Sequence, residues 1–370
     1  MKIVFITPRL TLGGYEKVVV NYANMLHEKG HAITILCGSQ EGELVELINK
    51  EIQIVNFNVR FRKFLIPLVK YLRKNEVDIL YAPFRSYTSI AIVSKWLSRN
   101  RKCVIYGTMH GYEKSNKIVE HLQGKIIKHA EVLSSLTRHL AKHEEKTLGI
   151  SEDRYICLKN PVIDSRKKIV KESHKWLGEN KKVPVIITSG RLEKDKRYDL
   201  ALRIFAETLK YADMKMILLG SGSELKNLKN LANKLEISDK VDFLGFVSNP
   251  MGYMIQSDMY LHTAEVEAFG NTVVEALYCN LPIITTKCVG PVEIIEENRY
   301  GIVIDNCDTA KQIEKKGAEA ILDVLHHKKH FRGMKEKALQ YDVQSLEEEF
   351  LEPYYEYIRR NKKEDYNINS

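Results

Sequence analysis

Short apolar runs rich in β-branched residues alternate with longer amphipathic stretches along most of the chain. The runs predict strands at 2–6, 32–37, 78–81, 103–106, 132–135, 155–158, 185–189, 215–219, 241–244, 259–262, 283–286 and 301–304. Most segments between them are long enough for a crossover helix. Nearly continuous apolar strands separated by helices are typical of parallel sheets covered on both faces. The pattern therefore predicts an α/β protein with two doubly wound, Rossmann-like parallel-sheet domains that face a cleft.

A break in this alternation marks the expected domain boundary. Asn160-Pro161 is a turn signal, and the polar stretch 165–182 separates it from the next strand. We expect an N-terminal domain at 1–163 and a C-terminal domain at 164–345. The last helical stretch, 346–370, is expected to pack back on the first domain, with a kink at Pro353.

Length and composition agree with this outline. A chain of 370 residues is too long for one ordinary core, and 44% hydrophobic and 28% charged residues are typical of a soluble globular protein. No apolar run approaches the roughly 18 residues of a membrane span, and the first strand is too short for a signal peptide. The cysteines lack metal-binding spacing, which predicts reduced residues of a cytoplasmic protein: Cys37, Cys103, Cys157, Cys279, Cys288 and Cys307.

The positive charge lies in one half of the chain. Residues 1–163 contain 25 Lys and Arg against 15 Asp and Glu, a net charge of +10, whereas the remainder carries −1. This asymmetry predicts that the first domain meets an anionic partner, which could be a nucleic acid, a phosphate-bearing substrate or a membrane surface.

The loops after the predicted strands hold the candidate chemistry, because open α/β sheets bind ligands beyond the carboxyl ends of their strands. Gly13 and Gly14 precede a helix, where free backbone amides suit an anion, although a plain tight turn has the same pattern. His110 follows another strand and is either functional or incidental. Arg191 and Lys196 suit a diphosphate, unless their loop is merely a solvated charged surface.

A later loop, "EVEAFGNTVVEALYCN" at 265–280, places two carboxylates eight positions apart. Thr272 and Glu275 have the spacing of a helix-capping box, with Thr272 as the N-cap, and Asn280 suits the left-handed end of that helix. The capping box leaves Glu267 unexplained. Beside anion-binding loops, Glu267 and Glu275 are equally suited to hold sugar hydroxyls, which carboxylates bind as acceptors.

Together these motifs resemble the retaining GT-B glycosyltransferases of family four, over residues 2 to about 345. The resemblance rests on the Gly-Gly loop, "SGRLEKDKRYD", "LLGSGSE", "VDFLGFV" and above all the E-x7-E segment "EAFGNTVVEALYCNLPIITT". The family usually has glycine where this chain has Ala268 and Asn280. Both replacements are small or tolerate the left-handed conformation, so the resemblance to the fold stands.

The resemblance implies a role for each matching residue. Catalytic roles fall to a carboxylate at the donor sugar, a histidine near donor and acceptor, and two cations on the departing diphosphate: Glu267, His110, Arg191 and Lys196. Substrate binding falls to the ribose-binding glutamate, the helix-start loop, the nucleobase contact and the Gly-Gly loop: Glu275, Phe269, Gly270, Asn271, Thr272, Phe246, Val247, Gly13 and Gly14.

The resemblance also implies the reaction. A hexosyl or N-acetylhexosaminyl group would pass with retention from a nucleotide diphosphate sugar, by family habit a UDP-sugar, to a glycan or lipid-linked glycan acceptor. The first domain would bind the acceptor and the second the donor, in the synthesis of a cell-surface polysaccharide such as lipopolysaccharide. No metal and no cofactor is implied, and no D-x-D sequence is present.

Other functional classes fit less well. A sugar-nucleotide epimerase or an inverting GT-B transferase shares the architecture, but the E-x7-E segment argues against both. A basic nucleic-acid-binding protein would need bases beside exposed aromatic residues or a known binding module, and neither is found, so no nucleic-acid partner is expected. A catalytically silent scaffold disagrees with the presence of Arg191, Lys196, Glu267 and Glu275.

Two basic amphipathic stretches in the first half predict peripheral membrane association. Residues 59–75 interleave bases with an apolar stripe of Phe61, Phe64, Leu65, Leu68, Val69 and Leu72. Residues 116–131 have a similar character. Such stretches can lie in an anionic bilayer interface at the inner face of the cytoplasmic membrane. The alternative is that both stripes face their own sheet and that the bases are solvated.

Overall fold

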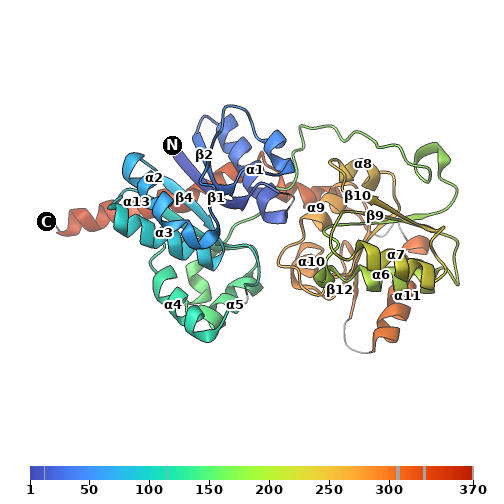
Figure 1. The fold of residues 1–370 in the computed structure, drawn as a ribbon. Coiled ribbons are helices and arrows are strands. Elements are labelled where there is room, and N and C mark those ends of the chain that lie inside the picture. Colours follow the sequence, from blue (N-terminus) through green and yellow to red (C-terminus); the bar gives the residue numbers. More distant parts are fainter. Residues whose placement is uncertain (12, 114, 306–308, 328–330, 369–370) are drawn as a thin grey trace. The chain divides into compact units, whose positions relative to one another are not determined.

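The computed structural model describes residues 1–370 apart from 12, 114, 306–308, 328–330 and 369–370. The described chain forms two compact units, one made of Met1–Val162 with Tyr341–Ser370 and the other of Ile163–Gln340. Each contains one fully parallel sheet with helices packed on it (Figure 1). The predicted pair of doubly wound α/β domains is therefore confirmed as a fold class.

The first unit has a seven-stranded sheet in the order β3-β2-β1-β4-β5-β6-β7. Its elements are β1 (Lys2–Arg9), α1 (Gly14–Glu28), β2 (Ala32–Ser39), η1 (Glu43–Leu47), β3 (Gln53–Asn56), η2 (Phe61–Lys63), α2 (Leu65–Lys74), β4 (Ile79–Pro83), α3 (Phe84–Ser98), β5 (Val104–Met109), α4 (Lys117–Ile127), β6 (Val132–Ser135), α5 (Arg138–Leu148), η3 (Glu152–Arg154), β7 (Tyr155–Cys157) and the C-terminal α13 (Leu346–Ile368).

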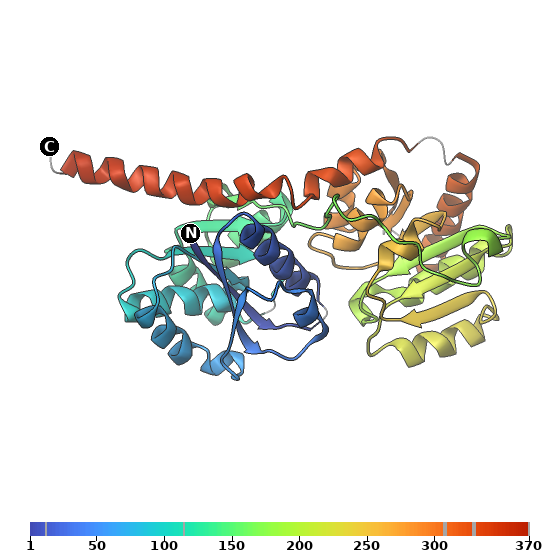
Figure 2. The ribbon, with the colours of Figure 1, turned by 90° about the horizontal axis from the view of Figure 1, so that it is seen from above.

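Helix α13 returns to the first unit. Figure 2 shows it lying along the side of that unit. Phe350 is fully buried and contacts the rings of Phe5, Tyr22 and Tyr81, and its carbonyl accepts a hydrogen bond from the Tyr106 hydroxyl at 3.1 Å. Because the same face of the sheet also buries α1, α1 and α13 together form one layer. The helix continues through Pro353, where the sequence predicted a kink.

The second unit has a six-stranded sheet in the order β10-β9-β8-β11-β12-β13. Its elements are η4 (Gly178–Asn180), β8 (Val185–Ser189), η5 (Lys194–Lys196), α6 (Tyr198–Thr208), β9 (Lys215–Leu219), α7 (Leu225–Lys234), β10 (Val241–Gly245), α8 (Pro250–Met254), β11 (Met259–His262), α9 (Asn271–Tyr278), β12 (Ile283–Thr286), α10 (Val289–Ile294), β13 (Gly301–Ile304), α11 (Ala310–His327) and α12 (Met334–Ala338), followed at the junction by η7 (Leu339–Tyr341).

The core of the second unit follows from the apolar alternation of its strands. Ile186, Met216, Leu218 and Leu261 point to one face, where they pack with α6, α7 and α11. Helices α8 and α9 pack against β8, β11 and β12. Burial of both faces explains why these strands are almost wholly apolar.

Two sequence predictions need correction or completion. Strand β3 was not predicted, because "QIVN" is short and only half-buried at the edge of the sheet. The stripe at 59–75 is mostly internal: Phe64 is fully buried against Phe57 and Tyr87, and Leu68, Val69 and Leu72 are buried as well. The membrane-facing role predicted for that stripe is therefore wrong, since its apolar side packs inside the unit.

Two other predictions concern cysteines and the membrane. Cys37, Cys103, Cys279 and Cys288 are buried free thiols, Cys157 is an exposed one, and Cys307 lies outside the described residues. Within the described ranges, no helix combines the length and the apolar character that crossing a bilayer requires.

Candidate functional site

The second unit has its topological switch point between β8 and β11. The chain leaves β8 toward β9 on one side, and later returns to place β11 on the other side of β8. In parallel α/β sheets, the loops that follow the two strands at such a point diverge and leave room for a ligand. Here those two loops are 190–197 and 263–270, the same segments that the sequence marked.

Lys196 and Glu267 meet at this point. The Lys196 Nζ donates to the Glu267 Oε2 over 2.6 Å, although 71 residues separate them along the chain. The pair is partly buried, with side-chain exposures of 17% and 24%. Burial raises the pKa of Glu267, but the neighbouring His262 and the positive charge of Lys196 outweigh it and lower the pKa to about 2. Glu267 is therefore a carboxylate at neutral pH.

Hydrogen bonds between the two loops hold this pair in register. The Thr263 hydroxyl lies 3.1 Å from the carbonyl oxygen of Lys196 and 2.9 Å from that of Arg197. The Glu265 amide donates to the Asp195 carbonyl at 2.9 Å. Arg197, the N-cap of α6, has a positive φ of 51°, so the helix begins at Tyr198, two residues after Lys196. The loop after β8 is thereby fastened to the end of β11.

His262 is a site residue that sequence reasoning missed. Its Nε2 lies 3.9 Å from the Glu267 Oε2, and its Nδ1 lies 3.1 Å from the Thr285 hydroxyl oxygen. Thr285 donates its own proton to the Thr286 carbonyl at 2.9 Å, so Nδ1 must donate to Thr285. With Nδ1 held by Thr285, Nε2 is the ring atom that faces the Glu267 carboxylate. The only sequence signal was its place as the last residue of a strand.

Arg191 is separate from this cluster. Its side chain is exposed, and its guanidinium forms no ion pair with any carboxylate in the described part of the chain. Arg191 thus lies in the same loop as Lys196, but the two cations do not share a carboxylate in the structure.

Helix α9 starts differently from the sequence prediction. The helix begins at Asn271, its N-cap is Gly270 with φ of 109°, and no side chain caps it. Thr272 lies inside the helix, and its hydroxyl oxygen is 2.8 Å from the Tyr260 hydroxyl. The capping box is therefore wrong, because the helix has its N-cap at Gly270, two residues earlier than predicted. Asn280 has the predicted left-handed conformation, with φ of 57°.

Glu275 lies on α9 and is only 2% exposed. Phe269 is buried as well, and a Cβ on Gly290 would stand 2.2 Å from its carbonyl oxygen, so α10 begins in direct contact with this loop. By contrast, Phe246 is 48% exposed just beyond the carboxyl end of β10, and Val247 is half-buried. Phe246 is thus the predicted nucleobase contact whose ring is exposed to solvent.

The glycine loops after β8 and β9 are packed backbone to backbone. A Cβ on Gly220 would stand 1.8 Å from the Gly190 carbonyl oxygen, and one on Gly222 would stand 2.4 Å from the Leu192 carbonyl oxygen. The Leu192 amide donates to the Ser221 carbonyl at 2.8 Å. The "GSG" glycines therefore let one loop support the loop that carries Lys196.

The first unit holds the other predicted residues at the carboxyl ends of β1 and β5. Gly13 is the N-cap of α1, Gly14 is the first residue of that helix, and a carboxylate oxygen of Glu16 lies 1.9 Å from where a Cβ on Gly13 would stand. The His110 Nε2 is 2.8 Å from the Tyr81 hydroxyl, and its ring lies 4.6 Å from that of Tyr15.

Burial lowers the pKa of His110 to about 3. The imidazole is therefore neutral at physiological pH. It forms one hydrogen bond with Tyr81 and supplies no positive charge. Burial also raises the pKa of Tyr81, which keeps that hydroxyl protonated. Sequence reasoning found His110 but not Tyr81, which reads as an ordinary strand residue.

Within the described residues, no three His, Cys, Asp or Glu side chains come together in an arrangement suited to a metal ion.

Comparison with known proteins matches both units. Residues 12–166 match the profile of Glycosyltransferase Family 4, and residues 170–340 match that of Glycosyl transferases group 1. The N-acetyl-alpha-D-glucosaminyl L-malate synthase of Bacillus anthracis is 23% identical, covering 95% of this chain and 96% of its own. The GalNAc-alpha-(1->4)-GalNAc-alpha-(1->3)-diNAcBac-PP-undecaprenol alpha-1,4-N-acetyl-D-galactosaminyltransferase of Campylobacter jejuni is 24% identical, covering 95% and 97%.

Solved structures show the same fold. The Anabaena protein HepE in complex with UDP-glucose superimposes with a TM-score of 0.80 at 18% identity, covering 95% of this chain and 98% of its own. The two parallel sheets agree with that architecture, and the two family profiles fall on the two units. The chain therefore belongs to the GT-B glycosyltransferases of family four.

Proposed function

We propose that this glycosyltransferase is a retaining, metal-independent enzyme that moves a hexosyl or N-acetylhexosaminyl group from a UDP-sugar to a glycan or lipid-linked glycan. The second unit would bind the donor and the first unit the acceptor, at the inner face of the cytoplasmic membrane. The observation that carries the proposal is the Lys196–Glu267 contact of 2.6 Å at the switch point. The UDP-glucose bound to HepE and the N-acetylhexosamine in the names of both relatives support the choice of donor.

The geometry supports a division of labour within this pair. Glu267 is ionised, so its oxygens can accept hydrogen bonds from sugar hydroxyls. An ammonium group has three N–H donors, and Glu267 takes one of those of Lys196, which leaves others for the diphosphate. A cation held in place before the reaction stabilises the negative charge that develops on the leaving group.

The proposed transfer needs no covalent intermediate. The bond between the anomeric carbon and the β-phosphate oxygen breaks, and the acceptor oxygen forms the new bond on the same face of the sugar. The acceptor proton passes to the departing phosphate oxygen, which balances the charge. Neutral His110 would orient a hydroxyl group through hydrogen bonding, without taking a charge of its own.

The stereochemistry and the metal requirement test the proposal directly. With an α-linked UDP-N-acetylhexosamine or UDP-hexose as donor, we expect NMR of the product to show an α-linkage, and we expect EDTA to leave the rate unchanged. A β-linked product would assign the chain to an inverting mechanism. A rate that falls with EDTA and recovers with Mg²⁺ would show that a metal does part of the work assigned to Lys196.

Changing Glu275 to Gln tests the donor site. The amide keeps the volume of this buried side chain but loses the charged acceptor. Since a hydrogen bond to a charged group contributes about 1.5–3 kcal/mol, donor affinity should fall about 10- to 100-fold in calorimetric titration. Glu265→Gln, an exposed carboxylate in the neighbouring loop, is the control and should bind donor normally. Normal affinity in Glu275→Gln together with a large loss of stability would assign Glu275 a purely structural role.

A further inference from the structure

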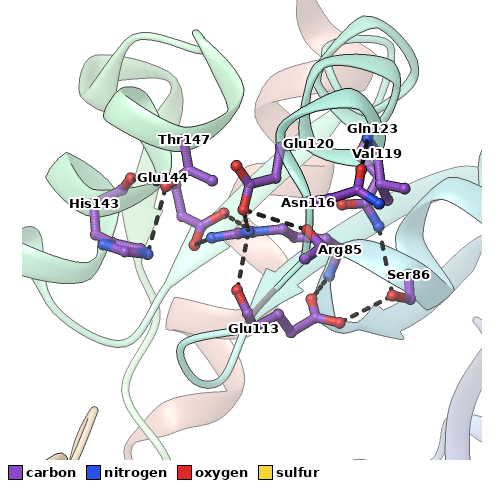
Figure 3. A network of polar contacts seen from close by, with 11 residues as sticks. Arg85, Ser86, Glu113, Asn116, Val119, Glu120, Gln123, His143, Glu144 and Thr147 are labelled. Carbon is purple, nitrogen blue, oxygen red and sulfur yellow. Dashed lines mark hydrogen bonds and ion pairs between the residues drawn. The ribbon is translucent and has the colours of Figure 1, made fainter.

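The first two turns of helix α4 in the first unit are inverted relative to an ordinary surface helix, although Ile127 at its end is buried. A surface helix normally buries its apolar side and exposes its charges. In α4 the polar residues Glu120 and Gln123 face the network around Arg85 (Figure 3), whereas several apolar residues are exposed. Helix α2, the other stretch for which the sequence predicted membrane contact, buries Leu68, Val69 and Leu72 in the usual way.

The inward side of α4 rests on a buried charge cluster. Arg85 is 1% exposed and Glu144 is fully buried, and they form two hydrogen bonds of 2.7 and 2.8 Å. Glu120 lies 3.7 Å from the same guanidinium, and Gln123 donates to the Ser86 hydroxyl at 3.5 Å. These contacts fix the rotation of α4 about its axis.

Close backbone packing fixes the same rotation. A Cβ on Gly124 would stand 2.1 Å from the Leu148 carbonyl oxygen, so glycine is required for the approach of α4 to α5. The Asn116 side chain caps the helix by accepting from the Val119 amide at 2.9 Å. The helix is thus held at its start, along its inner side and at its glycine, and it cannot roll to bury its outer side.

The outer side of α4 is apolar and exposed. Ile118 is 75% exposed, Leu122 is 54% exposed and Val119 is 39% exposed. Ile118 and Leu122 are four residues apart and therefore adjacent on the helix surface. We name Ile118, Val119 and Leu122 the α4 ridge.

Basic residues flank the α4 ridge. Lys117, Lys125 and the C-cap Lys128 are exposed, and Glu120, the only acid of α4, faces inward to Arg85. The adjacent helix α5 adds further exposed bases, Arg138, Lys142 and Lys146, against one exposed acid, Glu145.

We infer that the α4 ridge inserts into the interface of an anionic lipid bilayer, with the flanking lysines on the lipid headgroups. Apolar residues bordered by bases are the pattern by which helices lie in a bilayer interface, and the net charge of +10 on residues 1–163 has the required sign. An acidic protein would also attract the lysines, but it would need a pocket shaped to the α4 ridge. A lipid bilayer can take up the ridge without such a pocket. This inference rests on the membrane location in the proposed function and assigns it to a particular surface. Vesicle binding is measured without a sugar donor, and donor hydrolysis serves only to check that the variants are folded, so that either proposal can fail alone.

Cosedimentation of the full chain with vesicles tests the inference. We expect binding to phosphatidylglycerol–phosphatidylcholine vesicles, little binding to phosphatidylcholine alone, and weaker binding as salt is added. Ile118→Ser with Leu122→Ser should lower the partition coefficient about tenfold or more. Lys117→Ser with Lys125→Ser should lower it about fivefold for each base removed.

A matched pair of substitutions serves as the control. Leu47 and Ile66 are 56% and 65% exposed in the same unit, and Ile66 lies on α2 among other bases. Changing both to Ser should leave vesicle binding and donor hydrolysis unchanged. The variant Ile118→Ser with Leu122→Ser should also hydrolyse the donor at the wild-type rate. The inference is overturned if wild-type protein does not bind anionic vesicles at low salt. It is also overturned if binding survives the α4 change, or depends on Leu47 and Ile66 instead.

Discussion

Replacing Lys196 by alanine is expected to lower kcat by about 10²-fold or more at saturating donor. Removal of one preorganised donor from a developing negative charge has costs of this size. The change also leaves Glu267 without the cation that lies 2.6 Å away. Steady-state rates of sugar transfer, measured with the donor saturating, give the effect on kcat separately from that on donor binding.

A double substitution separates two explanations for that loss. If Lys196 only neutralises Glu267, then Glu267→Gln should suppress most of the effect of Lys196→Ala. If Lys196 acts on the diphosphate, the loss should persist in the background of Glu267→Gln, apart from the coupling of neighbouring groups. Full recovery of turnover in the double variant would contradict the role proposed for Lys196.

The pH dependence gives a second signature of the same change. In the folded enzyme the pKa of Glu267 is lowered to about 2, so its favourable pairing is present above the ordinary carboxylate range and is lost as pH falls toward 2. Without the charge of Lys196, the pKa of Glu267 should rise above its value in the wild-type enzyme. The acid limb of kcat/KM should therefore move to higher pH in Lys196→Ala. Lys194→Ala, an exposed lysine in the same turn, should leave both kcat and the profile unchanged.

The sequence predicted a feature well where few structures are compatible with the residue type found at that position. Lys196 and Glu267 could be placed together because both follow strands of a predicted parallel sheet, whose carboxyl ends share an edge. The strand positions themselves followed from uninterrupted apolar runs, since both sheet faces are buried. Asn280 was predictable because few residues other than glycine adopt its left-handed backbone conformation.

The remaining features depend on contacts between distant segments. His262 and Tyr81 read as ordinary strand residues, and only the folded chain shows the partners of their polar atoms. The start of α9 was placed wrongly because Thr272 has the sequence of a cap but bonds to Tyr260 instead. The orientation of α4 was hidden as well, because a hydrophobic pattern shows that a helix has two sides but does not state which side is buried.

The largest effect on stability is expected from Arg85→Ala. This change leaves the fully buried Glu144 without its cation, and breaking a buried ion pair by removing one partner costs about 3–5 kcal/mol. Trp96 lies in the first unit and Trp176 in the second, so a Trp176→Phe background makes fluorescence report on the first unit alone. Urea unfolding in that background should show the lowered midpoint.

The control variants identify the buried charge as the cause. Arg62→Ala removes an exposed arginine of the same unit and should change stability by no more than about 0.5 kcal/mol. Arg85→Met combined with Glu144→Leu removes both charges and keeps apolar volume, so it should recover most of the stability lost in Arg85→Ala. Equal losses in the single and double variants would show that packing around Arg85, and not the unpaired carboxylate, determines the cost. Because Glu120 of α4 approaches the same guanidinium, a loss in the single variant should also loosen α4, with faster amide hydrogen exchange over 117–127.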